Sequence, residues 1–286
     1  MHIRSFTQPV AVAKAMETPS QKEAPETNSP VLDCYSPGEP RPEPLLSPGM
    51  LATQRSATTQ EMIDRIQEQL DREWKFFGSQ TYDAEGRLVK RGFSEEDPAV
   101  FKRVGYFWET GTGLLLDGKD RDWPWSAAFI STVHEDAKVG PQFFRSPAHA
   151  RYIRDAILKK TAGVEDAAYW GHRTTERAPQ VGDMVCYSRQ SGVSYDRQPL
   201  RYQSHADIVT AVRPGEIDVV GGNVGHSVSK KAVKTDENGL IVDENYNWFA
   251  VLEPRNLEQV FHSPPPESEE ETYPRPPQNL TPDDVD

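Results

Sequence analysis

Prolines cluster at the two ends of the chain and leave a proline-poor stretch between them. Nine of the 24 prolines lie in residues 1–50 and seven in residues 263–286. Runs as rich in Pro, Ser and Glu as residues 36–44 bury too little apolar surface to offset the entropy of ordering. We therefore predict a disordered leader over residues 1–57, one folded domain over 58–262 and a disordered acidic tail over 263–286.

Charge and apolar content exclude several classes of protein. The formal net charge is −12, and the two predicted tails carry most of it. A weakly acidic domain with no run of five Lys or Arg lacks the positive surface that nucleic acids require. Because no stretch reaches about 18 apolar residues, we predict no membrane span, and no secretory signal is evident at the start.

Few residues are available as metal ligands or redox groups. The two cysteines are Cys34 in the predicted leader and Cys186 in the domain, so no disulfide framework or paired-cysteine metal site is expected. His134 is followed by Glu135 and Lys138, which breaks the H-E-x-x-H zinc pattern and favours a solvated helix face. We expect no metal site and no cofactor.

Apolar periodicity predicts helices in the first part of the domain. The segment T-T-Q-E at residues 58–61 resembles a capping box, and apolar residues follow it at helical spacing until Gly78. Two further helices are expected, one over residues 126–137 and one that begins at residues 146–147. The intervening stretch 79–122 is predicted to be irregular.

After Gly182 the pattern changes to alternation, which is typical of strands. The expected strands are residues 183–188, 204–213, 217–221 and 247–252. Helices followed by antiparallel strands indicate an α+β domain in which the helices pack on one sheet.

Ser126 is the first candidate for chemistry. It follows Trp123-Pro124-Trp125 at the start of a predicted helix, where unpaired backbone amides and the helix dipole favour a developing negative charge. A nucleophile is expected at such a position, although a serine there is also a common helix N-cap. Trp123 and Trp125 are candidates for stacking on a substrate, with core packing as the alternative.

A second set of candidates lies on the predicted strands. Alternation places His205 and Asp207 on one face of a strand, and Asn223 follows the end of the next strand of the hairpin. His205 is the candidate acid/base and Asn223 the candidate group that orients its ring. Asp207 adds support only if its side chain reaches His205. A purely structural role in the sheet or a turn is the alternative for each.

Four segments in this order resemble a known family. They are W-S-A-A-F-I-S at residues 125–131, G-D-M-V-C-Y-S-R at 182–189, S-H-A-D-I-V at 204–209 and G-G-N-V at 221–224. Over roughly residues 60–255 the chain resembles the CHAP and NlpC-like branch of the papain-fold cell-wall amidases. It is most similar to an uncharacterised domain-of-unknown-function branch in which serine replaces the catalytic cysteine.

The resemblance implies a papain-like fold and hydrolysis of an amide in the stem peptides of bacterial peptidoglycan. Ser126 would form the acyl-enzyme, with His205 as base and Asn223 as orienting residue. Two departures are the serine itself and Gly221, where CHAP domains often carry glutamate. The alternative is a catalytically inactive module, derived from the same fold, that binds the cell wall or has a structural role.

The same interpretation implies a particular kind of route by which the protein reaches the cell wall. A bacterial or phage cell-wall hydrolase made in the cytoplasm without a signal peptide needs another route to the periplasm or wall. We expect a specialised secretion system, a phage particle or cell lysis to supply that route, and an immunity protein is a further candidate partner.

Overall fold

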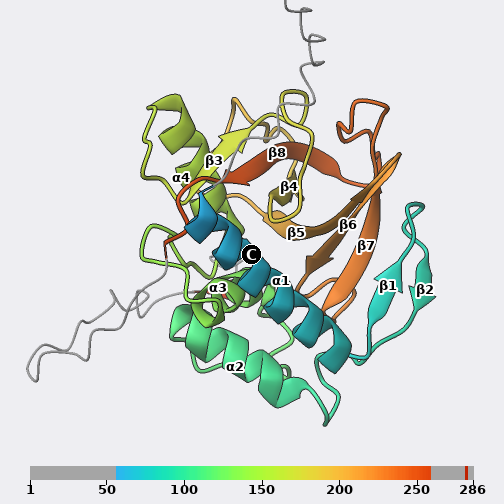
Figure 1. The fold of residues 1–286 in the computed structure, drawn as a ribbon. Coiled ribbons are helices and arrows are strands. Elements are labelled where there is room, and N and C mark those ends of the chain that lie inside the picture. The colour runs from blue at the N-terminus through green and yellow to red at the C-terminus, as the bar shows by residue number, and fades with distance from the viewer. Residues whose placement is uncertain (1–55, 259–280, 283–286) are drawn as a thin grey trace, which may run out of the picture. The chain divides into compact units, whose positions relative to one another are not determined.

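The structure, a computed structural model, describes residues 56–258 and 281–282 (Figure 1). In this part the chain forms four helices and one eight-stranded mixed sheet, so the α+β prediction is confirmed. The predicted disordered leader and acidic tail lie almost entirely outside the described residues.

The helices are α1 (Ala57–Phe76), α2 (Phe101–Thr112), α3 (Ser126–Asp136) and α4 (His149–Thr161). The cap of α1 is Ser56, whose Oγ accepts a hydrogen bond from the Thr59 N–H at 3.1 Å, two residues before the predicted capping box. Gly78 follows the end of α1 with φ +80°, a left-handed conformation that favours glycine. The helix α2 lies inside the stretch predicted to be irregular, and that prediction was wrong.

The strands are β1 (Gln80–Tyr82), β2 (Leu88–Lys90), β3 (Tyr169–His172), β4 (Met184–Ser188), β5 (Ser204–Arg213), β6 (Glu216–Gly221), β7 (Ser229–Lys234) and β8 (Asn247–Pro254). Their order in the sheet is β2-β1-β7-β6-β5-β4-β8-β3. The β1–β7 pair is parallel, and the other described pairs are antiparallel.

Four strands were predicted to within two residues, and four were missed. The strands β1 and β2 are three residues long, too short for a periodic signal. In β7 the buried positions are Ser229, Lys231 and Val233, and Lys231 is 3% exposed, so a charged residue interrupts the apolar alternation. Tertiary burial of a lysine is not visible in sequence periodicity.

The sheet has apolar clusters on both faces. The main core lies between the helices and one face, and it includes Ala206 and Ile208 of β5. A smaller cluster on the other face includes Val185, Val209 and Val219. Residues 204–209 are therefore buried on both faces, and Figure 1 shows the sheet curling around the second face.

His134 corrects another expectation. It is 1% exposed and stacks on Phe143 with ring centroids 3.8 Å apart, so the predicted solvated face is wrong at this residue. Its ring contacts the Ile130 carbonyl and the Tyr169 hydroxyl, both at 2.8 Å. Two hydrogen bonds satisfy a polar group that burial would otherwise penalise.

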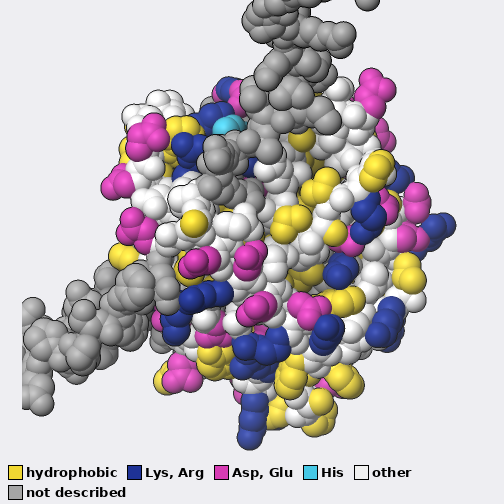
Figure 2. Space-filling model, in the orientation of Figure 1, with side chains coloured by type: hydrophobic (Ala, Val, Ile, Leu, Met, Phe, Trp, Pro, Cys, Tyr) yellow, Lys and Arg dark blue, Asp and Glu magenta, His cyan; other side chains and the backbone are white. Residues whose placement is uncertain are grey.

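The surface view in Figure 2 shows acidic and basic side chains interspersed over α1 and the β1–β2 side. Charges of opposite sign alternate on this face instead of forming a patch of one sign. Among the described residues, no helix is long and apolar enough to cross a membrane.

Candidate functional site

Ser126 is the first residue of α3 and is fully buried. The N-cap position belongs to Trp125, so Ser126 is not the cap residue of its helix. Its Oγ lies 2.7 Å from Nε2 of His149, the first residue of α4. The starts of two helices thus bring a hydroxyl and an imidazole into direct contact.

The other ring nitrogen of His149 is also engaged. Nδ1 contacts the hydroxyl of Tyr152, one turn further along α4. Burial, followed by the nearby His205 and Arg189, lowers the pKa of His149 well below its ordinary value, so the ring is neutral near pH 7. With its proton on Nδ1, the ring donates to Tyr152 and accepts from the Ser126 hydroxyl.

A second buried network is formed by β5 and β7. His205 Nε2 donates to Asp207 Oδ1 at 3.0 Å, so Asp207 does reach the ring. Lys231 Nζ lies 2.8 Å from the other carboxylate oxygen, Oδ2. The second ring nitrogen, Nδ1 of His205, accepts from Arg189 Nη2 at 3.2 Å.

Burial and charge explain the protonation states of this network. Burial alone would raise the pKa of Asp207, but Lys231 and His205 hold it below its usual range. Burial lowers the pKa of His205 to about 4, although Asp207 opposes the shift. A neutral imidazole therefore stands beside an ionised carboxylate and a buried ammonium.

The two networks meet at the histidines, whose ring centroids are 5.0 Å apart. We call the combined group the Ser126 cluster; its members are Ser126, His149, Tyr152, His205, Asp207 and Lys231. Each member is between 0% and 3% exposed. A hydroxyl in direct contact with a neutral imidazole, with a carboxylate on the neighbouring imidazole, is the kind of arrangement that activates a nucleophile.

Gly221, at the end of β6, leaves room for this cluster. A Cβ at this position would overlap Asp207 Oδ1 and would lie 3.1 Å from His205 Nε2. The glycine that departs from the CHAP pattern is thus the residue that permits the His205–Asp207 contact.

Asn223 lies at the start of α3 instead of at His205. With φ +53°, it follows β6 and presents its amide to the Trp125 backbone, where the oxygen accepts from the N–H at 3.2 Å. The amide nitrogen donates to Glu95 Oε2 at 3.2 Å. Asn223 therefore satisfies a backbone donor at the helix start, a capping function that sequence spacing did not indicate.

The two candidate substrate-binding tryptophans have different positions. Trp125 is 1% exposed, lies against Phe77 and Phe107 with centroid distances of 5.8 and 5.7 Å, and donates its indole N–H to Glu95. It is a core residue, and its ring is not available for stacking on a ligand. Trp123 is half-buried and lies edge-on to Trp108.

Comparison with known proteins shows a match to one protein family. Residues 96–254, more than half of the chain, match a family described as uncharacterised proteins conserved in bacteria, DUF2272. The chain belongs to the DUF2272 family. The matched region runs from just before α2 to the end of β8 and contains every member of the Ser126 cluster. Neither the curated proteins nor the solved structures contain a match.

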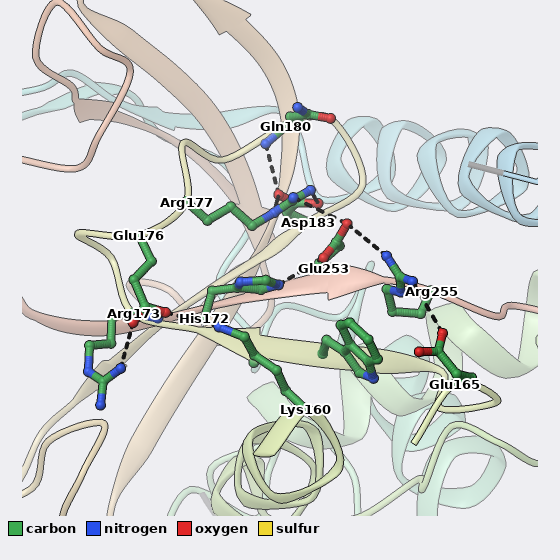
Figure 3. Close-up of polar contacts among 12 residues, drawn as sticks. Lys160, Glu165, His172, Arg173, Glu176, Arg177, Gln180, Asp183, Glu253 and Arg255 are labelled. Carbon is green, nitrogen blue, oxygen red and sulfur yellow. Dashed lines mark hydrogen bonds and ion pairs between the residues drawn. The ribbon is translucent and has the colours of Figure 1, made fainter. Parts of the chain in front are cut away.

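The DUF2272 region also holds a buried ionic network outside the Ser126 cluster (Figure 3). Arg177 donates to both oxygens of Asp183, at 2.9 and 3.1 Å, and lies 3.3 Å from Glu253. Glu253 also contacts His172 at 2.8 Å. These contacts join β3, β8 and the segment before β4, so Asp183 of the G-D-x-V motif has a structural role.

His149, Tyr152 and Lys231 are the members of the Ser126 cluster that sequence reasoning missed in this DUF2272 chain. The H-x-x-Y spacing of His149 and Tyr152 places them one helical turn apart, but no local pattern shows that α4 begins beside α3. Cys186 lies in the main core, where burial raises the pKa of its thiol well above the ordinary value. No metal-binding group of three or more His, Cys, Asp or Glu occurs among the described residues.

Proposed function

We propose that this protein is a serine-dependent amide hydrolase that acts on the stem peptides of peptidoglycan. The observation that carries the proposal is the 2.7 Å contact between Ser126 Oγ and His149 Nε2 at the first turn of α3. A serine hydroxyl is a weak nucleophile without a base within hydrogen-bond reach, and His149 supplies that base.

The assignment of the base differs from the one expected from sequence. Both ring nitrogens of His205 are engaged, by Asp207 and by Arg189, whereas a nitrogen of His149 faces the Ser126 hydroxyl. We therefore assign His149 as the base and His205 with Asp207 as the neighbouring pair. The negative charge of Asp207 favours a protonated His149, as its upward effect on the His149 pKa indicates.

The proposed reaction has two steps. In the first, Ser126 Oγ forms a bond to the amide carbonyl carbon while its proton passes to His149 Nε2. The C–N bond then breaks, the leaving amine takes that proton, and an acyl-serine remains. In the second step water adds to the acyl carbon, gives a proton to His149, and Ser126 leaves with that proton.

The start of α3 offers stabilisation for the oxyanion. The first backbone N–H groups of a helix lack intrahelical partners and lie at the positive end of its dipole. Those of Ser126 and Ala127, the first two residues of α3, are the donors that we assign to this role.

The substrate class and the papain-like fold belong to the same proposal. Their support is the order of the motifs, with Ser126 on a helix and His205 on a later antiparallel strand, together with membership of a bacterial family. Because Ser126 is fully buried, substrate access requires movement of the side chains that cover it. This burial also favours a second candidate, an inactive module that binds peptidoglycan.

Mass spectrometry of purified peptidoglycan, incubated with the full chain, tests the proposal. The wild type is expected to release defined peptide fragments, and Ser126→Ala to release none. Ser131→Ala is the matched control, because Ser131 is also a buried serine of α3 but bonds to the Ser146 carbonyl.

Two results would contradict the proposal of a serine-dependent hydrolase. Fragment release by Ser126→Ala equal to that of the wild type would exclude Ser126 as nucleophile. A silent wild type together with an active Ser126→Cys variant would favour the inactive module, and cosedimentation of the wild type with peptidoglycan would then be the decisive measurement.

A further inference from the structure

Glu95 is a buried glutamate beside the start of α3. It lies in the segment between β2 and α2 and is 5% exposed. One carboxylate oxygen, Oε2, accepts the indole N–H of Trp125 at 2.6 Å and the amide N–H of Asn223 at 3.2 Å. The other oxygen, Oε1, lies 2.9 Å from Nδ1 of His226. Three polar contacts compensate the burial of this carboxylate and fix its position.

The carboxylate of Glu95 determines which way the Asn223 amide faces. A carboxylate accepts hydrogen bonds and does not donate them, so the NH₂ group of Asn223 faces Glu95. The amide oxygen then faces the backbone N–H of Trp125 and accepts from it at 3.2 Å. In the opposite orientation the NH₂ group would meet that backbone donor. Without an acceptor at position 95, the amide would lose one of the two contacts that orient it.

Trp125 is therefore held by Glu95 in two ways. Its indole N–H bonds to the carboxylate directly, and its backbone N–H bonds to Asn223, whose orientation depends on the same carboxylate. Trp125 is the N-cap residue of α3, and its carbonyl accepts a backbone hydrogen bond of 2.9 Å from the first turn. The N–H groups of Ser126 and Ala127 come next along the chain, so their direction depends on the placement of Trp125.

The loop between β6 and β7 is held in an uncommon conformation by the same glutamate. Asn223 and His226 have φ values of +53° and +60°, in the left-handed region that residues other than glycine seldom adopt. Both side chains contact the Glu95 carboxylate, and the Glu95 backbone N–H donates to the His226 carbonyl at 2.7 Å. Backbone strain of this kind persists where surrounding contacts impose it, and it is concentrated at functional sites.

We propose that Glu95 is a positioning residue for the oxyanion site: through Trp125 and Asn223 it fixes the backbone donors at the start of α3. This inference rests on the proposed hydrolase function and adds the residue that prepares the site for the oxyanion. Stabilisation of an oxyanion requires donors that are in place before the reaction, so a small displacement of the helix start weakens it. Glu95 acts through its two neighbours and does not touch the reacting atoms.

A boronic acid tests this site without turnover. Acetamidomethylboronic acid is titrated into the full chain, with ¹¹B nuclear magnetic resonance as readout. Ser126 Oγ forms a bond to the trigonal boron while its proton passes to His149, and the boron becomes tetrahedral and negatively charged, like the carbon centre of the proposed reaction. We expect the wild type to form this adduct and Ser126→Ala to form none.

Two substitutions of Glu95 separate its hydrogen bonds from its charge. Glu95→Ala should weaken the adduct by about tenfold to a hundredfold, because Trp125 and Asn223 lose their common acceptor. Glu95→Gln should restore the affinity to within about threefold, because its amide oxygen can accept the same two hydrogen bonds. Asn223→Ala keeps Glu95 but removes the bond to the Trp125 backbone, and it should weaken the adduct by about tenfold.

Glu73→Ala is the matched control. Glu73 is also a buried glutamate, 2% exposed, but it belongs to α1 and pairs with Arg103 and Arg72. Its loss should lower the stability, measured by urea unfolding, and leave the boronate affinity of the folded protein unchanged. An equal loss of affinity in Glu95→Gln and Glu95→Ala, or an unchanged affinity in Asn223→Ala, would overturn the inference.

The same titration separates this inference from the proposed function. If the wild type forms no tetrahedral adduct, Ser126 is not the nucleophile, and the hydrolase and the role of Glu95 are both excluded. If the adduct forms equally well in the wild type and in Glu95→Ala, the role of Glu95 alone is excluded and the hydrolase is retained.

Discussion

Ser126 and His149 each open a helix, and their side chains meet at 2.7 Å in the interior of the protein. The contact joins residues 23 positions apart along the chain. Tyr152 holds the far side of the same ring, so the imidazole has one orientation relative to the hydroxyl. This geometry makes His149 the first residue to test after Ser126.

His149→Gln should abolish most of the peptidoglycan cleavage. An amide side chain of similar length cannot accept the Ser126 proton at neutral pH, so kcat is expected to fall by about 10²–10⁴. His205→Gln retains the Ser126–His149 contact and should lose less. Fragment release over time measures both; a larger loss in His205→Gln would identify His205 as the base.

Asp207→Asn should destabilise the fold strongly. The substitution leaves the buried Lys231 ammonium without its carboxylate, and loss of one partner of a buried pair costs about 3–5 kcal/mol. Asp71→Asn removes an exposed partner of Lys75 and should have a much smaller effect. Urea unfolding followed by circular dichroism compares the two; similar midpoints would show that Lys231 is not paired in solution.

Gly221→Ala should separate His205 from Asp207. The added methyl group overlaps Asp207 Oδ1, and overpacking of this kind costs about 1–3 kcal/mol. The ¹⁵N resonance of His205 Nε2 is expected to move because its hydrogen-bond acceptor is displaced. Gly192→Ala, where a Cβ meets open space but φ is +77°, measures the separate cost of backbone strain without steric overlap and should leave the His205 resonance in place. An unchanged resonance in Gly221→Ala would contradict the tight packing seen at β6.

Stability should fall as the pH is lowered from about 6.5 to 4. Burial is the main cause that lowers the pKa of both His134 and His205 from 6.5 to about 4. Between these values the unfolded chain binds protons that the native protein excludes, so acid favours unfolding. Each histidine contributes a slope of up to about 1.4 kcal/mol per pH unit.

Urea unfolding at a series of pH values measures this slope. In His134→Gln one of the three buried imidazoles, those of His134, His149 and His205, is absent, so the stability should depend less steeply on pH than in the wild type. An identical slope in the two proteins would mean that His134 titrates normally in the native state.

Arg177→Leu should destabilise the second ionic network (Figure 3). Asp183 and Glu253, both buried, would lose their shared guanidinium, and a loss of about 3–5 kcal/mol is expected. Arg213→Leu removes a guanidinium from two carboxylates near the surface and serves as the control. Comparable thermal midpoints for the two variants would show that the network is not essential for the fold.

Local patterns in the sequence were sufficient to predict several helices and strands. The strand β5 has the predicted bounds, 204–213, because its alternation and the following turn are encoded in consecutive residues. The start of α3 at Ser126 and the end of α1 before Gly78 agree with expectation for the same reason. The common face of His205 and Asp207 also follows from the two-residue period of a strand.

Other features depend on contacts between distant segments. The hairpin neighbour argument placed Asn223 near His205, but the left-handed turn after β6 directs it to the Trp125 backbone. The strand β7 was missed because one of its buried residues is Lys231, whose charge is compensated by Asp207 of β5. Such compensation involves residues that share no local pattern.

The sequence by itself determined the class of fold, the helix that carries Ser126 and the strand that carries His205 and Asp207. Only the tertiary structure decided that His149 is the partner of Ser126 and that Lys231 pairs with Asp207. Periodicity in the sequence indicates which face of an element is buried, because side chains on one face recur every two residues in a strand and every 3.6 residues in a helix. Which side chains then meet depends on how the elements pack, and no repeat in the sequence records that packing.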